Sequence, residues 1–348
     1  MMIDVKGLTD AQVDGYIWKI KRELGDGLFI PVHHYQRDEV VQFADCIGDS
    51  LELSRMSAGT PSRCILFCGV YFMAEIARTL ASEDQQVHIP NPSAGCPLAD
   101  FAFHKDVEYV WELLQELHPG EYVPVTYANS HIEVKAFCGE NEGFVCTSSN
   151  AQKIFSHILM EKKRVFFLPD KNLGLNTAAA LGMTDNCCVV DRHSQDILRL
   201  GECSIVVWNG FCIVHRVFTL GQVKEWRERE PEARIIVHPE CDPDVVQASD
   251  ESGSTSKIKT MVEGSPEGSK WVIGTEYNMV RRLKRENPGK LVEPLEVSIC
   301  ENMSKNSRRD LLETLLAYRS GDSARQVVLP AGVKENALRA ISRMLRIS

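Results

Sequence analysis

The 348-residue chain contains no apolar run near the ~18 residues that a membrane-spanning helix needs, and its N-terminus has no signal-peptide profile. It also lacks a long basic run, and its formal net charge is −9. A nucleic-acid-binding surface needs clustered Lys and Arg side chains, so this composition argues against a nucleic-acid partner. Together these absences predict a cytoplasmic protein with neither a membrane nor a nucleic-acid partner.

The 12 cysteines do not form the pattern of a compact disulfide framework. Without a secretion signal, they fit a reducing cytosol in which thiols stay free for metal binding or catalysis. The adjacent Cys187 and Cys188 are interpreted as incidental and not as metal ligands. They lie in segment 174–203, whose Gly and Asn residues predict a helix followed by a surface excursion.

Short β-branched runs alternate with longer amphipathic segments along the chain, which predicts βαβ units with parallel sheets. The hydrophobic fraction of 44% and charged fraction of 25% are typical of a globular protein, and the length predicts two or three domains. The predicted helices cover 38–47, 70–81, 106–118 and 150–162. The predicted strands cover 28–32, 64–68, 87–89, 123–127, 144–147, 164–168, 204–208, 234–238, 271–275 and 295–299.

Three cysteines stand out because each follows a strand-like apolar run and no CxxC knuckle joins them: Cys96, Cys212 and Cys300. Three thiolates from three separate strand ends would suit a metal cluster that keeps one metal ion open to substrate. The alternative is that all three are buried, inert thiols. The rhythm of strands between them predicts three similar α/β units, although no sequence repeat is visible.

Polar side chains gather where the predicted strands end, which is where parallel α/β proteins bind ligands. A His-x-Glu pair such as His238 and Glu240 can hold a carbonyl and exchange protons near neutral pH. Tyr35 could relay a proton or anchor an anion. A zinc site built from three histidines is the competing chemistry, with His33, His34 and His238 as its ligands. However, adjacent His33 and His34 on an extended chain point to opposite faces.

A Gly- and Ser-rich stretch at 249–258 precedes an apolar helix pattern. Such a helix N-terminus binds phosphate through free backbone N–H groups and short hydroxyl side chains. Ser254 and Thr255 are the candidates. The alternative is that this stretch is only a helix cap within a flexible loop.

A dozen motifs, in order from about residue 25 to the C-terminus, resemble quinolinate synthase. They are VHHYQ (32–36), GDSLELS (48–54), FCGVYFMAE (67–75), PSAGCPLAD (92–100), VTYANS with VKA (125–136), CTSSNA (146–151), FLPD with LG (167–174), WNGFCIVH (208–215), HPEC (238–241), SGSTSKI (252–258), GTE (274–276) and CENM (300–303). Two departures are visible: the position of His34 is more often Asn or Tyr in that family, and segment 174–203 looks longer than usual.

The resemblance implies a transferase that condenses iminoaspartate with dihydroxyacetone phosphate to quinolinate, the pyridine precursor of NAD, with loss of phosphate and two waters. It implies an oxygen-sensitive [4Fe-4S] cluster that acts as a Lewis acid on three cysteine ligands, Cys96, Cys212 and Cys300. An L-aspartate-oxidising enzyme is the candidate partner that would supply iminoaspartate.

The family fold is three α/β units about a pseudo-threefold axis, with the active site at their junction. We expect the first unit to comprise 1–100 with a C-terminal helix at about 320–348, the second 101–213 and the third 214–319.

The resemblance also implies the residues around the substrates. Tyr35, Glu240, His33 and His238 are the catalytic candidates. Glu240 and Tyr35 would move protons, and His33 and His238 would polarise carbonyls or bind carboxylate. The expected substrate-binding residues are His33, Ser50, Tyr127, Asn129, Ser148, His238, Glu240, Ser254 and Thr255.

Two other functions stay open. A cluster-dependent hydro-lyase acting on a small carboxylate would share the open iron and the anion-binding serines. A non-catalytic iron–sulfur sensor would need neither a His-x-Glu pair nor a phosphate site.

Overall fold

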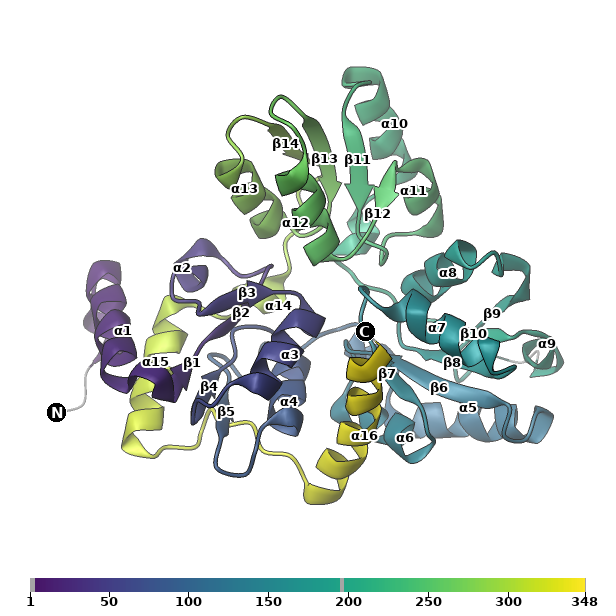
Figure 1. Cartoon of the computed structure of the whole chain (residues 1–348), viewed down its shortest axis with the longest axis horizontal. Coiled ribbons are helices and arrows are strands. Elements are labelled where there is room, and N and C mark those ends of the chain that lie inside the picture. Colours follow the sequence, from purple (N-terminus) through teal and green to yellow (C-terminus); the bar gives the residue numbers. More distant parts are fainter. Residues whose placement is uncertain (1–3, 195–196, 348) are drawn as a thin grey trace. The chain divides into compact units, whose positions relative to one another are not determined.

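The computed structural model describes residues 4–194 and 197–347 (Figure 1). The chain divides into two compact units. Unit 1 comprises Met1–Gly95 and Ile299–Leu329, and unit 2 comprises Cys96–Ser298 and Pro330–Ser348. Every pairing between the strands of these described residues is parallel, which confirms the predicted α/β class. No helix in the described part of the chain is long and apolar enough to cross a membrane.

Unit 1 contains two small parallel sheets that nearly continue each other. The strand order is β1-β4-β5 in one and β2-β3 in the other, and only Ile30 separates β1 from β2. Val32 of β2 forms a bridge with Cys68, so β2 also lies beside the β4 segment. The elements are η1 (Val5–Gly7), α1 (Asp10–Leu24), η2 (Gly25–Gly27), β1 (Leu28–Phe29), β2 (Pro31–His33), α2 (Asp38–Val41), β3 (Cys46–Gly48), α3 (Ser50–Gly59), β4 (Cys64–Leu66), α4 (Tyr71–Leu80), β5 (Gln86–His88), α14 (Glu301–Ser304) and α15 (Arg308–Ser320).

The core of unit 1 contains side chains from both of the chain segments that form this unit. Helix α1 begins with a capping box between Thr9 and Gln12, and it buries one stripe of apolar side chains at helical spacing. That stripe is Val13, Ile17 and Ile20, and it belongs to one core cluster with Leu311, Leu312 and Leu315 of α15.

Unit 2 begins with a five-stranded sheet in the order β7-β6-β8-β10-β9. Helices cover both of its faces, so its central strands are buried throughout, as Val165–Leu168 of β8 are. Its elements are η3 (Ala99–Phe101), α5 (His104–Leu117), β6 (Tyr122–Tyr127), α6 (Ile132–Glu140), β7 (Phe144–Cys146), α7 (Ala151–Met160), β8 (Arg164–Leu168), α8 (Lys171–Ala180), η4 (Thr184–Asn186), β9 (Cys187–Val190), α9 (Ile197–Glu202) and β10 (Ile205–Trp208).

A four-stranded sheet follows in the same unit, in the order β12-β11-β13-β14. Its elements are η5 (His215–Val217), α10 (Leu220–Arg229), β11 (Arg234–Val237), α11 (Pro243–Ala248), β12 (Glu251–Ser252), α12 (Thr255–Gly264), β13 (Lys270–Gly274), α13 (Tyr277–Glu286) and β14 (Leu291–Pro294). If β1 and β2 are counted as one interrupted strand, that strand lies between β3 and β4. In the same way β6 lies between β7 and β8, and β11 lies between β12 and β13. This repeated topology is compatible with three similar units, and the pseudo-threefold arrangement and the three domain boundaries stay predictions.

The C-terminal helix α16 (Ala331–Ile347) packs against α6 and β7 within unit 2. The sequence had suggested that it joins the first unit. Gly139 of α6 explains the observed packing, because a Cβ added there would lie 1.8 Å from the backbone oxygen of Asn336. Only glycine lets the two helices approach this closely.

Most predicted strands and helices are present, but three segments differ. The predicted strand at 295–299 is a loop, and the fourth strand of its sheet is β14, four residues earlier. The predicted helix at 38–47 ends at Val41 and is followed by β3. The helix predicted in 174–203 is α8, whereas the excursion after it contains the edge strand β9, which pairs with β10.

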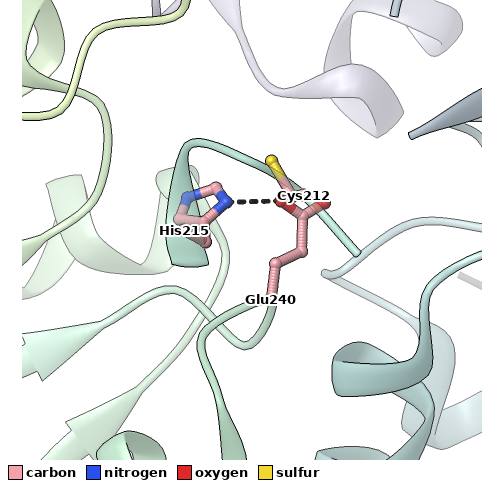
Figure 2. Close-up of side chains that lie close together, drawn as sticks. All are labelled: Cys212, His215 and Glu240. Atoms are coloured by element: carbon pink, nitrogen blue, oxygen red, sulfur yellow. Dashed lines mark ion pairs between the residues drawn. The ribbon is translucent and has the colours of Figure 1, made fainter. Parts of the chain in front are cut away.

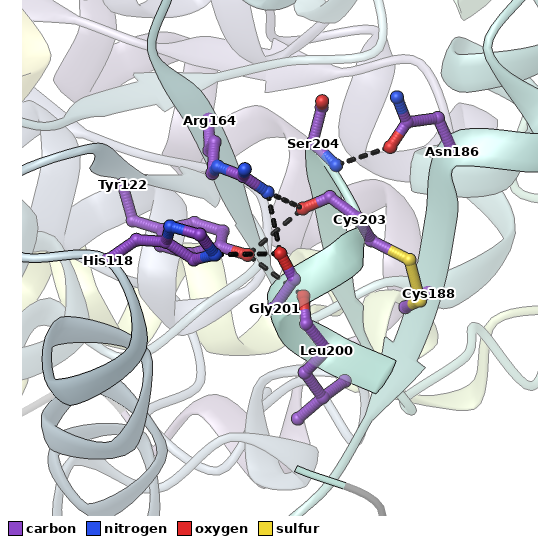
Figure 3. Close-up of a disulfide and its surroundings, with 9 residues drawn as sticks. All are labelled: His118, Tyr122, Arg164, Asn186, Cys188, Leu200, Gly201, Cys203 and Ser204. Atoms are coloured by element: carbon purple, nitrogen blue, oxygen red, sulfur yellow. Dashed lines mark hydrogen bonds between the residues drawn. A yellow bond between two sulfur atoms is a disulfide. The ribbon is translucent and has the colours of Figure 1, made fainter. Parts of the chain in front are cut away.

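A disulfide joins Cys188 and Cys203, whose Cα atoms are 5.9 Å apart (Figure 3). The prediction that all thiols stay free is therefore wrong for these two. Pairing of β9 with β10 places Cys188 opposite Val206, which brings it near the residues that precede β10. Tyr122 and Arg164 donate hydrogen bonds to the backbone oxygen of Cys203 and fix this turn.

Candidate active site

The predicted polar side chains of unit 2 follow the ends of three strands, β6, β8 and β11. In the five-stranded sheet the topology reverses between β6 and β8, and in the four-stranded sheet between β11 and β13. Ligands of parallel α/β proteins bind in the crevice at such a switch point. Asn129 follows β6, Asp170 follows β8, and His238 and Glu240 follow β11.

Glu240 also lies beside Cys212 and His215 (Figure 2). Its Oε2 is 2.6 Å from Nδ1 of His215, and the two side chains are 3% and 1% exposed. Cys212 completes a triplet whose ligand atoms all lie within 4.8 Å of one another. Cys212 as a residue is half-buried. The other nitrogen of His215 contacts the hydroxyl of Thr275 at 3.2 Å, which fixes the orientation of the ring.

His238 and Asn129 complete the surroundings of the Glu240 carboxylate. The His238 ring stacks on the ring of His215 with centroids 4.4 Å apart, and its Nδ1 is 3.6 Å from Glu240. Asn129 donates from Nδ2 to Glu240 at 3.5 Å. Burial alone raises the pKa of Glu240, but the nearby His215 and His238, with hydrogen bonds from His215 and Tyr127, lower it to about 2. Glu240 is therefore ionised at neutral pH.

Asp170 is a second buried carboxyl group in the same region. Its Oδ1 accepts a hydrogen bond from the backbone N–H of Leu173 and caps α8, while its Oδ2 has no partner among the described residues. Burial and the charge of Glu240 raise the pKa of Asp170 well above its usual range. The pKa values of these two interacting carboxyl groups are thus shifted in opposite directions, which is the arrangement that separates an acid from a base in many active sites.

Cys96 and Cys212 lie near each other in unit 2. Burial, Glu240 and Cys96 all raise the pKa of the Cys212 thiol well above its usual range. A thiolate in such a place needs a neutralising cation, and metal binding supplies one by displacing the proton. The soft donor set therefore fits an iron–sulfur or zinc centre.

The remaining predicted residues of this unit lie on β6, after β7 and at the start of α12. Tyr127 is buried, and Ser148 is half-buried two residues after β7. Ser254 is the N-cap of α12, where its hydroxyl accepts from the backbone N–H of Lys257 at 3.3 Å. Thr255 follows it as the first residue of the helix. The helix cap that one of the two alternatives predicts is therefore present. Phosphate binding at this helix end stays a prediction.

Four predicted residues belong to unit 1. His33 ends β2 and is buried, and its ring meets the ring of Tyr35 edge-on at 4.7 Å. Ser50 begins α3 directly after the N-cap Asp49. Cys300 is the N-cap of α14 and is half-buried. The association of Cys300 with Cys96 and Cys212 in one cluster stays a prediction.

Two residues of the site are given no role by the sequence analysis. His215 ends the motif WNGFCIVH and lies three residues beyond Cys212, one turn away in η5. Asp170 belongs to the motif FLPD and directly follows the Pro after β8. The three-histidine zinc site finds no support in the described residues, because their one compact group of potential metal ligands contains none of His33, His34 and His238.

The chain is similar to known proteins over nearly its full length. The family model described as "Quinolinate synthetase A protein" matches residues 16–346. A quinolinate synthase of Listeria monocytogenes serotype 4b is 42% identical, with 99% of this chain and 96% of the relative covered. A quinolinate synthase of Bacillus subtilis is 41% identical over 99% of this chain and 95% of the relative. One of Bacillus anthracis is 43% identical over 97% and 94%.

Proposed function

Since the chain belongs to the quinolinate synthetase A family, we propose that it condenses iminoaspartate with dihydroxyacetone phosphate and releases quinolinate, phosphate and two waters. The observation that carries this proposal is the Cys212–His215–Glu240 group beside Cys96, in which two thiols that could hold a metal lie next to a histidine and a carboxylate that could exchange protons. The product would serve NAD biosynthesis, and the expected location is the cytoplasm. An L-aspartate-oxidising enzyme would supply the iminoaspartate.

We assign the cluster ligands to Cys96, Cys212 and Cys300. When bound there, a [4Fe-4S] cluster would supply one iron with an open position, which acts as a Lewis acid toward hydroxyl or carboxylate oxygens. The raised pKa of Cys212 supports this assignment, because that thiol is unsuited to carry its charge without a metal.

The ionised Glu240 is assigned the acceptor role among the protein groups. It holds the rings of His215 and His238 in place, so that an imidazole nitrogen can take up or release a proton during enolisation and ring closure. Asn129 and Tyr127 fix the carboxylate from the other side and offer polar groups to a substrate carboxylate. Asp170, whose pKa is raised by burial and by the charge of Glu240, is a candidate proton donor. His33 and Tyr35 of unit 1 are assigned to carbonyl polarisation and proton transfer.

The phosphate group of dihydroxyacetone phosphate is assigned to the N-terminus of α12. This helix of ten residues begins at Thr255, and its first N–H groups and the hydroxyls of Ser254 and Thr255 are the donors. Ser50 and Ser148 are assigned to the remaining carboxylate or phosphate oxygens.

The test is anaerobic reconstitution with iron and sulfide, followed by incubation with both substrates and detection of quinolinate. Each substrate alone serves as the control. Pyridine formation only with the pair supports the proposal. Dehydration of a small carboxylate without triose phosphate would indicate the hydro-lyase instead. A reconstituted protein that turns over neither would contradict the enzymatic proposal and favour the sensor.

A further inference from the structure

Glu240 lies in a loop, and side chains from a neighbouring helix hold the backbone of that loop. The loop comprises Pro239–Asp242, between β11 and α11. Asn176 of α8 donates from Nδ2 to the backbone oxygens of Pro239 and Cys241, both at 2.9 Å. Asn172, one turn earlier, donates to the backbone oxygen of Glu240 at 3.2 Å and to Oδ1 of Asp242 at 2.8 Å.

The two asparagines act from one face of one helix. Residues four apart in a helix lie one above the other, so Asn172 and Asn176 present their amides as a pair. Both are buried, at 0% and 9% exposure, Asn172 in the first turn of α8 and Asn176 in its interior, where asparagine has no intrinsic advantage. Three of their four hydrogen bonds provide backbone carbonyl groups with the donors that such groups need, and the fourth goes to the Asp242 carboxylate. We name Asn172 and Asn176 the α8 amide pair.

The position of α8 itself is fixed on both sides. Its Gly174 packs against β10, and an added Cβ would lie 2.5 Å from the Val207 side chain. Asp170 caps its N-terminus. The α8 amide pair therefore connects a rigid helix of the five-stranded sheet to the catalytic loop of the four-stranded sheet. Arg216 extends the connection, since its Nε is 3.3 Å from the same Asp242.

We propose that Asn172 and Asn176 are positioning residues that hold the Glu240 loop in the geometry needed for turnover. Neither side chain is assigned a contact with substrate or cluster. The inference rests on the proposed function, because it concerns the rate of that reaction. It extends the site to segment 174–203, whose first helix turns carry this support.

The test uses Asn176→Leu, which keeps the branched shape of the side chain and removes both donated bonds. We expect kcat to fall roughly 10–100-fold, the usual effect of residues that orient a metal site or its neighbours. KM for both substrates should stay within about threefold, and iron content should not change, because the pair touches neither. Hydrogen exchange of the segment 238–246 should accelerate in the variant. If Asn176→Leu does not fold, Asn172→Ala serves, since it removes the other two bonds at a smaller volume cost.

The matched control is Asn141→Leu. Asn141 also donates from Nδ2 to a backbone oxygen, that of Phe137 at 2.9 Å, but it caps α6 and contacts no residue of the site. The inference is overturned if kcat is unchanged, if Asn141→Leu lowers kcat equally, or if exchange of 238–246 stays at the wild-type rate. If the wild type makes no quinolinate, the proposed function fails, whereas the exchange rates still decide whether the pair holds the loop.

Discussion

Replacing Glu240 by Gln removes the charge at the centre of the site while keeping its shape. The carboxylate accepts the 2.6 Å contact with His215 and lies 3.6 Å from His238, and an amide can replace only part of this. Loss of a group that directs proton transfer lowers turnover by about 10²–10⁴-fold. We expect that loss in Glu240→Gln with iron content unchanged, because Glu240 is not a predicted cluster ligand.

The same substitution has a calculable effect on stability. The pKa of Glu240 falls from 4.5 to about 2 in the folded protein, which corresponds to on the order of 3 kcal/mol. Because the folded-state pKa is the lower one, this stabilisation is present above pH 4.5 and is lost as the pH falls toward 2. The difference in unfolding free energy between wild type and variant should therefore shrink over that interval.

Turnover, iron content and urea unfolding at several pH values measure these effects. Glu263→Gln is the control, since Glu263 is exposed and pairs with Lys259 one turn away. Near-normal turnover in Glu240→Gln would remove Glu240 from the mechanism. A stability difference that persists unchanged at pH 2–3 would contradict the assigned ionisation.

Three further predictions follow from the structure. Replacing any one of the three predicted cluster ligands by Ala should abolish the brown absorbance and the iron content of about four atoms that a cluster gives. The variants are Cys96→Ala, Cys212→Ala and Cys300→Ala, and the control Cys187→Ala should keep both properties. Full iron content in Cys300→Ala would refute the ligand assignment. The double variant Ser254→Ala with Thr255→Ala should bind dihydroxyacetone phosphate at least about tenfold more weakly, with unchanged iron content. Thr219→Ala, which removes the cap of α10, is the control and should not weaken binding. If both variants bind equally well, Ser254 only caps α12 and does not bind phosphate. Gly139→Ala should lower the free energy of unfolding in urea by about 1–3 kcal/mol. Gly15→Ala, on an open face of α1, is the control and should raise it by about 0.5–1 kcal/mol. An unchanged unfolding free energy in Gly139→Ala would contradict the close packing of α6 and α16.

The sheets could be predicted because their strands are buried on both faces and therefore appear as continuous apolar runs. Residues 164–168 match β8 at both ends. Short edge strands carry no such signal, and β12 has only two residues, both half-buried. The strand predicted at 295–299 is wrong because the segment has the alternating apolar and polar pattern of a strand but forms a loop. Val297 in this loop is 51% exposed.

The site could be predicted only where its residues directly follow strands. Asn129, His238 and Glu240 do so, and the structure brings these three together. His215 instead follows a loop and begins a 3-10 turn, so its contact with Glu240 depends on tertiary packing. The disulfide was missed for a similar reason, because the pairing of β9 with β10 that aligns Cys188 leaves no mark in the cysteine spacing.

Asn172 and Asn176 show why a sequence pattern alone could not complete the site. Asparagine in a helix ordinarily indicates a solvated face, since its side chain competes with the backbone for hydrogen bonds. Here the neighbouring residues Leu173 and Ala178 are buried on the sheet side, while the two amides are buried against a loop that begins more than sixty residues later. The burial of their amide nitrogens is tolerated because each Nδ2 donates two hydrogen bonds to oxygen atoms of the Glu240 loop. A polar residue inside an amphipathic helix can therefore support catalysis without contacting the substrate, and its role becomes visible only when its hydrogen-bond partners are known.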